Sequence, residues 1–244
     1  MNSLSKLKLL FQEGNIARVG RKLMTGKEAE VYIVEANNGE LQAAKVYKDS
    51  VHRSFKHMAR YTEGRKVKNS RRNRAINKKS QFGREEKEAE WQNTEVDLLY
   101  ALNTTTINVP KVHAWLDGVL IMDLITDDSG EPAPRLADVT LTEEQAQKYF
   151  DIILSDIVKL LDMGYVHGDL SEYNILSSKN GPVIIDFPQA VIASGNNQAF
   201  EILLHDVSTV RAHFQRFTSK KIPTTYAHEL WALYSKGKLT ADTQ

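Results

Sequence analysis

The chain has 244 residues, of which 41% are hydrophobic and 26% are charged, and its formal net charge is +1. It contains no cysteine, which excludes disulfide bonds, thiolate metal sites and a cysteine nucleophile. Residues 1–11 lack the long apolar core of a signal peptide, and no apolar run approaches membrane-spanning length. We therefore expect a soluble, cytoplasmic protein with one compact core and no membrane contact.

The first elements predicted are a short helix and a three-stranded antiparallel meander. Apolar residues at helical spacing predict a helix over Leu4–Phe11 that ends near Gly14. The second and third strands are expected to be joined by a two-residue Asn38-Gly39 turn. The pattern of alternating apolar residues predicts the strands themselves over residues 16–25, 31–34 and 41–47.

The turn between the first two strands lies where a loop that covers nucleotide phosphates would be. Its backbone N–H groups and the Thr25 hydroxyl are expected to face the nucleotide. It contains a single glycine, Gly26, so the turn taken by itself is equally typical of a plain hairpin. The residues predicted to contact ATP here are Thr25, Gly26, Lys27, Glu28 and Ala29.

A lysine interrupts the third predicted strand. Alternation places Lys45 on the same face as Ala43 and Tyr47, so its charge can point under the loop. This position matches that of the kinase lysine that contacts the α- and β-phosphates of ATP. Such a lysine needs a carboxylate partner to remain ordered and charged.

The partner is expected on a long helix predicted over Arg84–Leu102. Glu95 is preferred because it lies three, four or seven residues from residues of the apolar stripe, whereas the other acids stand among charges. The apolar side comprises Trp91, Val96, Leu98, Leu99 and Leu102, and the competing acids are Glu85, Glu86, Glu88 and Glu90.

Two further strands complete a predicted five-stranded sheet. They are expected over residues 109–112 and 119–122, joined by a turn at Gly118. Met122 is expected to line the back of an adenine pocket. The backbone groups of the connector from Asp123 to Ile125 are expected to meet the edge of the adenine ring.

A strongly basic segment lies between the lysine strand and the long helix. Residues 48–79 hold 12 of the 32 Lys and Arg residues and two of the 31 acids, so the segment carries +10 and the remainder −9. The stretch 48–84 is too long for a minimal connector. We expect a solvated loop, and also a contact for RNA, a ribosomal particle or an acidic protein that orders on binding. The hydroxyl groups available for phosphorylation there are those of Thr62, Ser70 and Ser80.

The carboxy-terminal half is predicted to be mainly helical. After a polar linker over residues 127–134, a capping box that starts at Thr142 begins a helix that Gly164 ends. Its broad apolar face is expected to support the segment that follows. Two more helices are expected, over about 198–217 and about 223–235.

The most informative stretch runs from Tyr165 to Phe187. It consists of an apolar run, a polar loop with Asp169 and Asn174, a second apolar run and then Asp186. This order places the three polar side chains at the ends of short strands. Asn174 and Asp186 offer oxygen ligands suited to Mg²⁺, which takes few protein ligands and leaves room for phosphate oxygens. Asp169 is close enough along the chain to face the same cavity as a base.

Each of these residues alone is a common cap or turn former. Together, His-x-Asp, an Asn five residues later and an apolar strand that ends in Asp-Phe form the pattern of a kinase catalytic loop and metal-binding strand. The sequence therefore predicts a phosphotransferase with an α+β, bilobal protein-kinase-like fold. Its parts are an amino-terminal lobe of about 1–122 with a five-stranded antiparallel sheet, a connector over 123–125, and a mainly helical, truncated carboxy-terminal lobe of about 126–244.

Two features of kinases are missing from the last part of the sequence. No Ala-Pro-Glu follows Asp186, and only 58 residues remain. A long activation segment and a large substrate-binding lobe are therefore both absent from the prediction.

The motifs together resemble the RIO family of atypical serine/threonine protein kinases, nearest its type-one branch, because no winged helix precedes the kinase domain. The resemblance runs through most of the chain. It is carried by residues 25–32, 44–48, Phe55-Lys56, Trp91 with Glu95, 102–104, 167–176 and 185–189.

The resemblance implies a single RIO-type domain over residues 1–244 that uses ATP with Mg²⁺, or Mn²⁺ in its place. It implies that Asp169 is the catalytic base or orienting carboxylate and that Asn174 and Asp186 bind the metal. It also implies that Lys45, paired with Glu95, contacts phosphate. Family members act in ribosome maturation, and the aspartate at Asp186 is implicated there in accepting phosphate during an ATPase cycle.

Two alternatives remain open at this point. A small-molecule kinase of the aminoglycoside or choline type shares His-Gly-Asp-Leu followed by Asn, but it usually has His-Pro-Gly where this chain has Ser171-Glu172-Tyr173. A nucleotide-gated assembly factor would use the basic segment to hold RNA and use ATP turnover to time its release.

Overall fold

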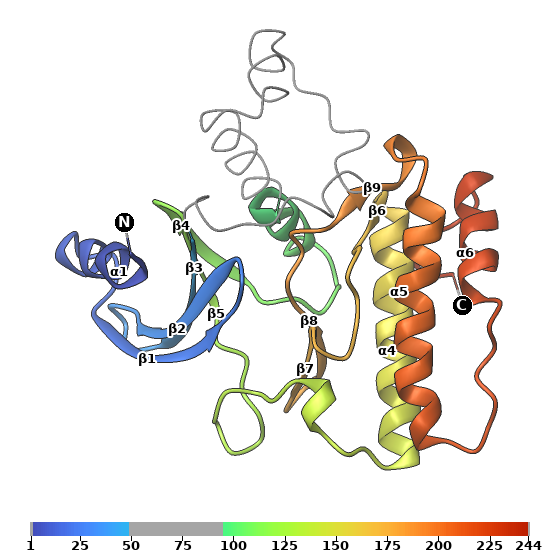
Figure 1. Ribbon diagram of the computed structural model, residues 1–244, viewed down its shortest axis with the longest axis horizontal. Helices are drawn as coiled ribbons and strands as arrows, with labels where there is room; N and C mark the ends of the chain where they lie inside the picture. Colours follow the sequence, from blue (N-terminus) through green and yellow to red (C-terminus); the bar gives the residue numbers. More distant parts are fainter. Residues whose placement is uncertain (1, 49–94, 244) are drawn as a thin grey trace, which may run out of the picture. The chain divides into compact units, whose positions relative to one another are not determined.

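The computed structural model describes residues 2–48 and 95–243 (Figure 1). Contacts divide them into two compact units. Among the described residues the first unit comprises 2–48, 95–104 and 110–124, and the second comprises 105–109 and 125–243. The basic segment beyond Lys48 and the predicted start of the long helix lie outside the described residues.

The first unit contains the predicted five-stranded antiparallel sheet, which confirms the fold class expected from the sequence. Its strands occur in the order β1-β2-β3-β5-β4, and each pairs antiparallel with its neighbour. The strands are β1 (Arg18–Thr25), β2 (Ala29–Glu35), β3 (Leu41–Tyr47), β4 (Val112–Leu116) and β5 (Val119–Asp123).

One face of this sheet packs against α1 (Ser3–Gln12). The helix begins at Asn2, whose side chain accepts a hydrogen bond from the Ser5 N–H at 2.8 Å. Because side chains alternate along β3, Ala44 and Val46 face this core while Lys45 faces the opposite side. The buried cluster comprises Leu7, Leu10, Ile16, Tyr32, Val34, Ala44, Val46, Val119 and Ile121.

The structure corrects the turn predicted between β2 and β3. The connection spans residues 36–40 and is closed by hydrogen bonds from Gly39 N to Ala36 O and from Ala36 N to Glu40 O. A two-residue type I′ turn would need positive φ at both Asn38 and Gly39, but only Gly39 has it (86°). The Asn-Gly pair therefore closes a longer loop.

The strand predicted over residues 109–112 begins later and extends further, as β4. The side chain of Asn103 ties down the preceding residues, since its amide donates to Pro110 O at 3.0 Å and its oxygen accepts from Val112 N at 2.6 Å. Pro110 also has no N–H to offer a strand. The predicted turn into β5 is present and has positive φ at both Asp117 and Gly118.

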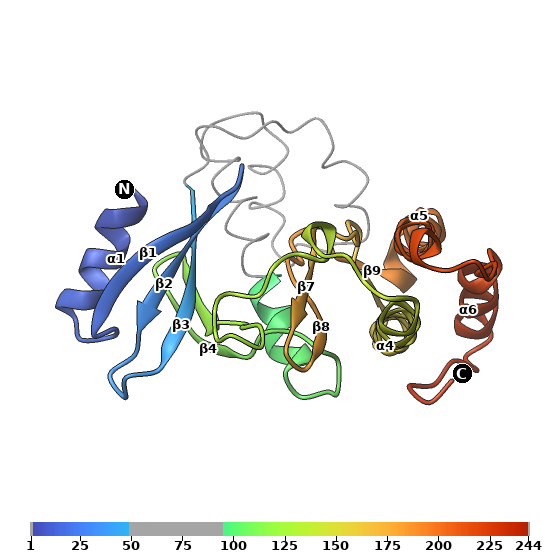
Figure 2. The same cartoon turned by 90° about the horizontal axis from the view of Figure 1, so that it is seen from below.

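The second unit contains three long helices and two small two-stranded sheets. Helix α5 lies beside α4 and beside α6 (Figure 1, Figure 2). The sheets pair β6 with β9 and β7 with β8. The elements are α4 (Glu143–Asp162), α5 (Ala199–Phe214), α6 (Tyr226–Ser235), β6 (Tyr165–Val166), β7 (Ile175–Ser178), β8 (Gly181–Ile184) and β9 (Val191–Ile192), with short 3₁₀ helices η3 (Leu136–Asp138), η4 (Ala193–Gly195) and η5 (Gln215–Phe217).

Helix α4 begins as the sequence predicted. The Thr142 hydroxyl accepts from Gln145 N, and the Gln145 side chain accepts from Thr142 N, so the capping box is complete. Its buried face packs on α5 through an edge-to-face contact between Phe150 and Phe214, whose ring centroids are 5.8 Å apart. Among the helices of residues 2–48 and 95–243, none has both the length and the apolar character needed to cross a bilayer.

Candidate active site

In the first unit, Lys45 forms a buried ion pair with Glu95. The ammonium nitrogen lies 2.6 Å from Glu95 Oε1, and both residues are less than 10% exposed. The Tyr47 hydroxyl donates to the other carboxylate oxygen at 2.5 Å. Glu95 is thus held by two donors from the same face of β3, as a buried carboxylate requires.

Met122 shares this face of the sheet. In antiparallel sheets, directly opposed residues point to the same side, and Met122 on β5 is opposite Ala43. The Asp123 N–H donates to Lys111 O at 2.9 Å, and the Asp123 carboxylate lies 2.7 Å from the His113 ring. The Asp123 N–H is therefore already bound within the sheet, and the contact of the other backbone groups of residues 123–125 with adenine remains a prediction.

The predicted phosphate loop is a tight hairpin turn. The N–H of Gly26 donates to Ala29 O at 2.9 Å, and the carbonyl of Gly26 accepts from Lys48 Nζ at 2.7 Å. The exposed Thr25 hydroxyl is 3.4 Å from Glu30. The N–H of Gly26 is thus used within the turn. The other groups predicted to contact phosphate are the Thr25 hydroxyl and the backbone N–H groups of Lys27, Glu28 and Ala29.

In the second unit, Asn174 fixes the carboxylate of Asp169. The Asn174 amide nitrogen donates to the backbone oxygen of Asp169 at 2.8 Å and to Oδ2 of its side chain at 3.1 Å. Because both contacts are with acceptors, the amide oxygen must face the other way. The oxygen of Asn174 and the Oδ1 atom of Asp169 therefore remain for a metal ion and for a substrate hydroxyl.

Asp186 is positioned by the residue before it. Ile185 N donates to Asn174 O at 2.9 Å, and the carbonyl of Ile185 accepts from His167 Nε2 at 3.2 Å. The other ring nitrogen of His167 accepts from the Asp169 N–H at 3.3 Å, which places the imidazole proton on Nε2. Both backbone groups of Ile185 are thus bound to the segment that carries Asp169 and Asn174.

Asp186 itself has a φ of 69°, in the left-handed region that non-glycine residues rarely adopt. Aspartate tolerates this conformation better than most residues, yet it costs free energy. The hydrogen bonds of Ile185 hold the backbone in place. A strained, well-anchored acid at this position is typical of a functional site.

A second anchor supports β8, the strand that leads to Asp186. Ile184 N donates to Asn108 O at 2.8 Å. The N–H and side-chain amide of Asn108 both donate to Asp156, at 3.2 and 3.0 Å, and Asp156 is almost wholly buried in α4. Helix α4 therefore supports β8 through one intervening residue.

The surroundings of Asp169 favour proton acceptance. Although the residue remains exposed at the surface, loss of hydration raises the pKa of its carboxyl group, and the nearby charge of Asp186 adds to the rise. The hydrogen bond from Asn174 and the charge of His205 oppose it. An effective general base has a pKa near the operating pH, so a raised pKa makes the Asp169 carboxylate better suited to this role.

Asp206 anchors the backbone on either side of Asp169. Its two carboxylate oxygens accept hydrogen bonds from Gly168 N at 2.8 Å and from Leu170 N at 3.0 Å. The residue is 2% exposed. Burial raises its pKa to about 7, although the two N–H donors oppose the rise.

This shift predicts a pH-dependent contribution of Asp206 to stability. A carboxyl group whose pKa is higher in the folded than in the unfolded chain stabilises the fold below about pH 4, and that contribution is lost as the pH rises to about 7. Relative to an Asp206→Asn variant, the free energy of unfolding of the native chain should fall by a few kcal/mol over this range, since one pKa unit corresponds to about 1.4 kcal/mol.

Urea denaturation of both proteins at intervals from pH 4 to pH 7 measures this difference. Using the difference removes the contributions of other titrating groups that the two proteins share, such as His213. A difference that stays constant across the range would contradict a raised pKa at Asp206.

The residues of the second unit fit a hard divalent cation. Asn174 supplies an amide oxygen and Asp186 a carboxylate, which are the oxygen ligands that Mg²⁺ takes in small number. No group of three or more His, Asp or Glu side chains with metal-ligand spacing occurs in the described ranges. An amide oxygen and a carboxylate oxygen suit an ion that retains several waters, as Mg²⁺ does.

Three residues with clear structural roles in the site were not predicted from the sequence. Tyr47 was placed only on the face of Lys45, yet it also holds Glu95. Asp206 had a visible signal, since it is an acid on the apolar stripe of α5 between Ile202 and Val210. His167 was identified as part of the motif, but its ring contacts follow only from the folded chain.

A family model described as the RIO domain matches residues 30–227. Among curated proteins, the chain is 31% identical over 238 residues to serine/threonine-protein kinase rio1 of Dictyostelium discoideum, which covers 96% of this chain and 38% of that protein. It is 34% identical over 207 residues to the RIO-type serine/threonine-protein kinase Rio1 of Methanocaldococcus jannaschii, with 83% and 63% of the two chains covered. The chain thus spans less than two thirds of the length of either relative.

Among solved structures, the fold is similar to that of the Rio2 kinase of Chaetomium thermophilum in a complex described as ADP/Mg²⁺-phosphoaspartate. The TM-score is 0.61 at 19% sequence identity, with 97% of this chain and 73% of that chain covered. A second structure of the Rio2 kinase from the same organism gives a TM-score of 0.63 at 20% identity. These likenesses establish the kinase-like fold.

Proposed function

The chain belongs to the RIO family, and from this membership we propose that it is an ATP- and Mg²⁺-dependent serine/threonine protein kinase or ATPase that also phosphorylates itself. The observation that carries the proposal is the set of hydrogen bonds that joins Asp169, Asn174 and the residue before Asp186. These bonds hold Asp169, Asn174 and the backbone before Asp186 in one cluster, which suits the fixed base and metal ligands that phosphoryl transfer requires.

In the proposed reaction, Asp169 accepts the proton of a serine or threonine hydroxyl through Oδ1, the oxygen that Asn174 does not bind. The hydroxyl oxygen forms a bond to the γ-phosphorus of ATP as the bond to the bridging oxygen breaks, and ADP leaves. Asn174 keeps the carboxylate aimed during this step. A carboxylate that is already oriented lowers the entropy cost of reaching the transition state.

Lys45 is proposed to contact the α- and β-phosphates, with Glu95 and Tyr47 keeping its ammonium group in place. Asn174 and Asp186 would hold Mg²⁺, which when bound neutralises negative charge on the phosphate oxygens. The remaining predicted ATP contacts, at Thr25 to Ala29, Met122, Asp123 and Ile125, are part of the same proposal.

The phosphoryl acceptor has two candidates. A serine or threonine residue gives a protein kinase, whereas Asp186 as acceptor gives an ATPase with a phosphoaspartate intermediate. The description of the Chaetomium Rio2 complex as a phosphoaspartate complex supports the second route as a candidate. The names of the relatives support a protein kinase over a kinase for aminoglycosides or choline.

The partners are proposed from the sequence. Residues 48–79 carry +10, which favours binding to RNA or a ribosomal particle in ribosome maturation, because phosphate neutralisation by Lys and Arg dominates such affinity. We further propose that residues 1–244 act as one kinase domain. We place it in the cytoplasm, where disulfide bonds are rare, because the chain has no cysteine with which to form them.

The metal assignment predicts a specific effect of Asn174→Ala. Loss of the amide oxygen should raise the Mg²⁺ concentration needed for half-maximal ATP turnover by at least about tenfold. Mutation of a residue that only supports a metal ligand already lowers metal affinity by about this factor. A Mg²⁺ titration of ADP release at saturating ATP measures it. Asn180→Ala, an exposed asparagine at the turn between β7 and β8, is the matched control. An unchanged Mg²⁺ requirement in Asn174→Ala would refute this ligand.

A further inference from the structure

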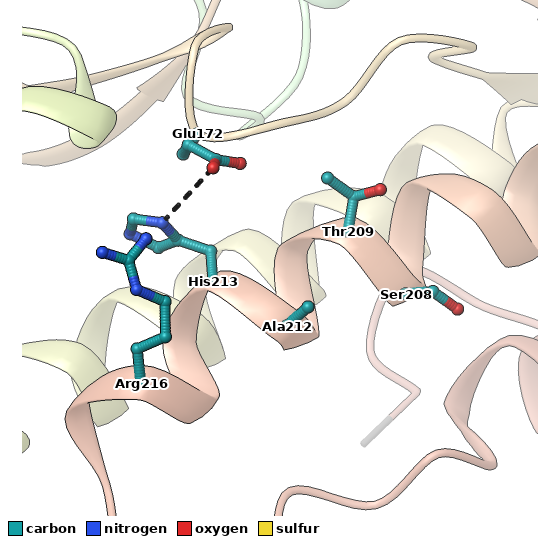
Figure 3. Close-up of a pocket in the computed structure, with 6 residues that line it drawn as sticks. All are labelled: Glu172, Ser208, Thr209, Ala212, His213 and Arg216. Atoms are coloured by element: carbon teal, nitrogen blue, oxygen red, sulfur yellow. Dashed lines mark ion pairs between the residues drawn. The ribbon is translucent and has the colours of Figure 1, made fainter.

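The second unit has a pocket of about 370 Å³, formed where Glu172 faces helix α5 and the η5 turn (Figure 3). Glu172 lies between Asp169 and Asn174 in the sequence. The other lining residues come from α5 and from η5, and they are Ser208, Thr209, Ala212, His213 and Arg216. The pocket thus adjoins the proposed catalytic loop.

His213 is buried at this pocket without a hydrogen bond. The residue is 4% exposed, and neither ring nitrogen has a partner among the described residues. The carboxylate of Glu172 faces the ring, but the distance of 3.9 Å from its Oε1 atom to His213 Nδ1 is too long for a hydrogen bond. An unsatisfied buried polar group costs free energy, so the His213 ring gains from a group in the pocket that can form a hydrogen bond with it.

One cationic side chain, that of Arg216, lines the pocket. The guanidinium group of Arg216 has five N–H donors, and across residues 2–48 and 95–243 it meets no carboxylate. The hydroxyl groups of Ser208 and Thr209 likewise have no hydrogen-bond partner within those ranges. Figure 3 shows the Arg216 guanidinium beside the imidazole of His213, with Glu172 across from them. A guanidinium group in this setting favours an anionic oxygen group, a carboxylate or a phosphate.

Glu172 adds a second requirement. Its backbone oxygen accepts from Ala137 N at 3.0 Å, which fixes the position of the residue. Its carboxylate would repel a bare anion, but it can accept a hydrogen bond from an N–H group next to that anion. A polypeptide supplies both, since an acidic or phosphorylated side chain is always accompanied by backbone N–H groups.

The pocket is open rather than enclosed, because Ala212 and Arg216 are both exposed to solvent. Small-molecule sites usually bury most of the ligand surface. An open pocket instead suits one side chain of a longer ligand. This again favours a polypeptide over a free metabolite.

The distance along the chain limits where that side chain lies in a substrate. Glu172 follows Asp169 by three residues, so their Cα atoms are at most about 11 Å apart. An extended peptide whose serine is at Asp169 covers the same distance in about three residues. The anionic side chain is therefore expected within three residues of the phosphorylated serine.

We propose that this pocket is a substrate subsite that binds a carboxylate or phosphate side chain of a polypeptide, within three residues of the serine or threonine that is phosphorylated. Arg216 binds the anionic group, and Glu172 accepts a hydrogen bond from the peptide backbone. The proposal rests on the proposed kinase function and specifies its substrate class as acidic or previously phosphorylated polypeptides.

The test uses decapeptides with a single serine and with Glu, Gln or Lys at each position from three before to three after it. Wild-type protein should phosphorylate one Glu peptide with a kcat/KM about tenfold or more above that of its Lys counterpart. One hydrogen bond to a charged group changes binding affinity by about tenfold or more. The Arg216→Glu variant should reverse this preference at the same position. The matched control Arg211→Glu, on α5 but outside the pocket, should keep it.

Absence of an acidic preference within three residues, or an Arg216→Glu variant that keeps it, would overturn the proposal. Fluorescence anisotropy of the labelled Glu peptide without ATP separates this result from failure of the kinase proposal. Weaker binding to Arg216→Glu than to Arg211→Glu supports the subsite even if no peptide is phosphorylated. Equal competition by inorganic phosphate and by a phosphoserine peptide would overturn the assignment to a polypeptide.

Discussion

Replacing Asp169 with asparagine should lower the rate of phosphoryl transfer by about 100- to 10,000-fold while leaving the fold intact. The change removes the carboxylate that accepts the hydroxyl proton but keeps a side chain of nearly the same shape. The Asn174 amide still has the backbone oxygen of residue 169 and an amide oxygen to bind. The loss should therefore appear in kcat, with little change in KM for ATP.

The measurement compares single-turnover transfer from labelled ATP in the variant and the wild type, together with their thermal midpoints. Asp162→Asn, an exposed acid at the end of α4, is the matched control and should behave as wild type. Transfer by Asp169→Asn within a factor of about ten of the wild-type rate would rule out the assigned base, because general-base catalysis is worth at least about 100-fold.

Glu95→Ala should lower the free energy of unfolding by about 3–5 kcal/mol, the usual cost of removing one partner of a buried ion pair. The change leaves the ammonium group of Lys45 buried without its carboxylate, and it also removes the acceptor of the Tyr47 hydroxyl. A domain of ordinary stability, about 5–15 kcal/mol, would lose about a fifth of its total or more.

Denaturant titration of three variants measures this effect and assigns it to the ion pair. Asp97→Ala, on an exposed position of the same helix, should change stability by less than about 0.5 kcal/mol. Adding Lys45→Met to Glu95→Ala should recover part of the loss, because the unpaired charge is then gone. A single Glu95→Ala cost under about 1 kcal/mol would show that the pair is not buried in solution.

Local patterns predicted the parts of the fold that depend on neighbours in sequence. Strand alternation placed Lys45 opposite the face of Ala44 and Val46, and the capping box placed the start of α4. The family was predicted from the order of short motifs, and the matching RIO-domain model and the Rio1 relatives confirm that resemblance.

The features that sequence reasoning missed depend on contacts between distant residues. The start of β4 is set by hydrogen bonds from Asn103 that no strand propensity reports. Asp206 lies more than 30 residues after the backbone groups that it holds. An acid on an apolar helical stripe is a usable signal, but the partner it serves becomes visible only in the fold.

The roles assigned to the individual site residues remain predictions, although the structure brings several of them together. Lys45 meets Glu95 in the first unit, and Asp169 meets Asn174 in the second. The Gly26 turn shows the greatest departure from expectation, since its N–H is already bound to Ala29 O. Any contact between this turn and phosphate would therefore come from the residues on either side of Gly26.

The central claim is that this chain transfers the γ-phosphoryl group of ATP in a reaction that needs Mg²⁺, Asp169 and Asp186. The most direct measurement incubates the purified chain with ATP labelled at the γ-phosphorus, with Mg²⁺ or with EDTA, and maps the label after acid treatment. We predict Mg²⁺-dependent label, acid-stable on serine or threonine or acid-labile on Asp186, and its loss in Asp169→Asn. Neither label nor ADP release with Mg²⁺ or Mn²⁺, or label that persists in both Asp169→Asn and Asp186→Asn, would contradict the claim.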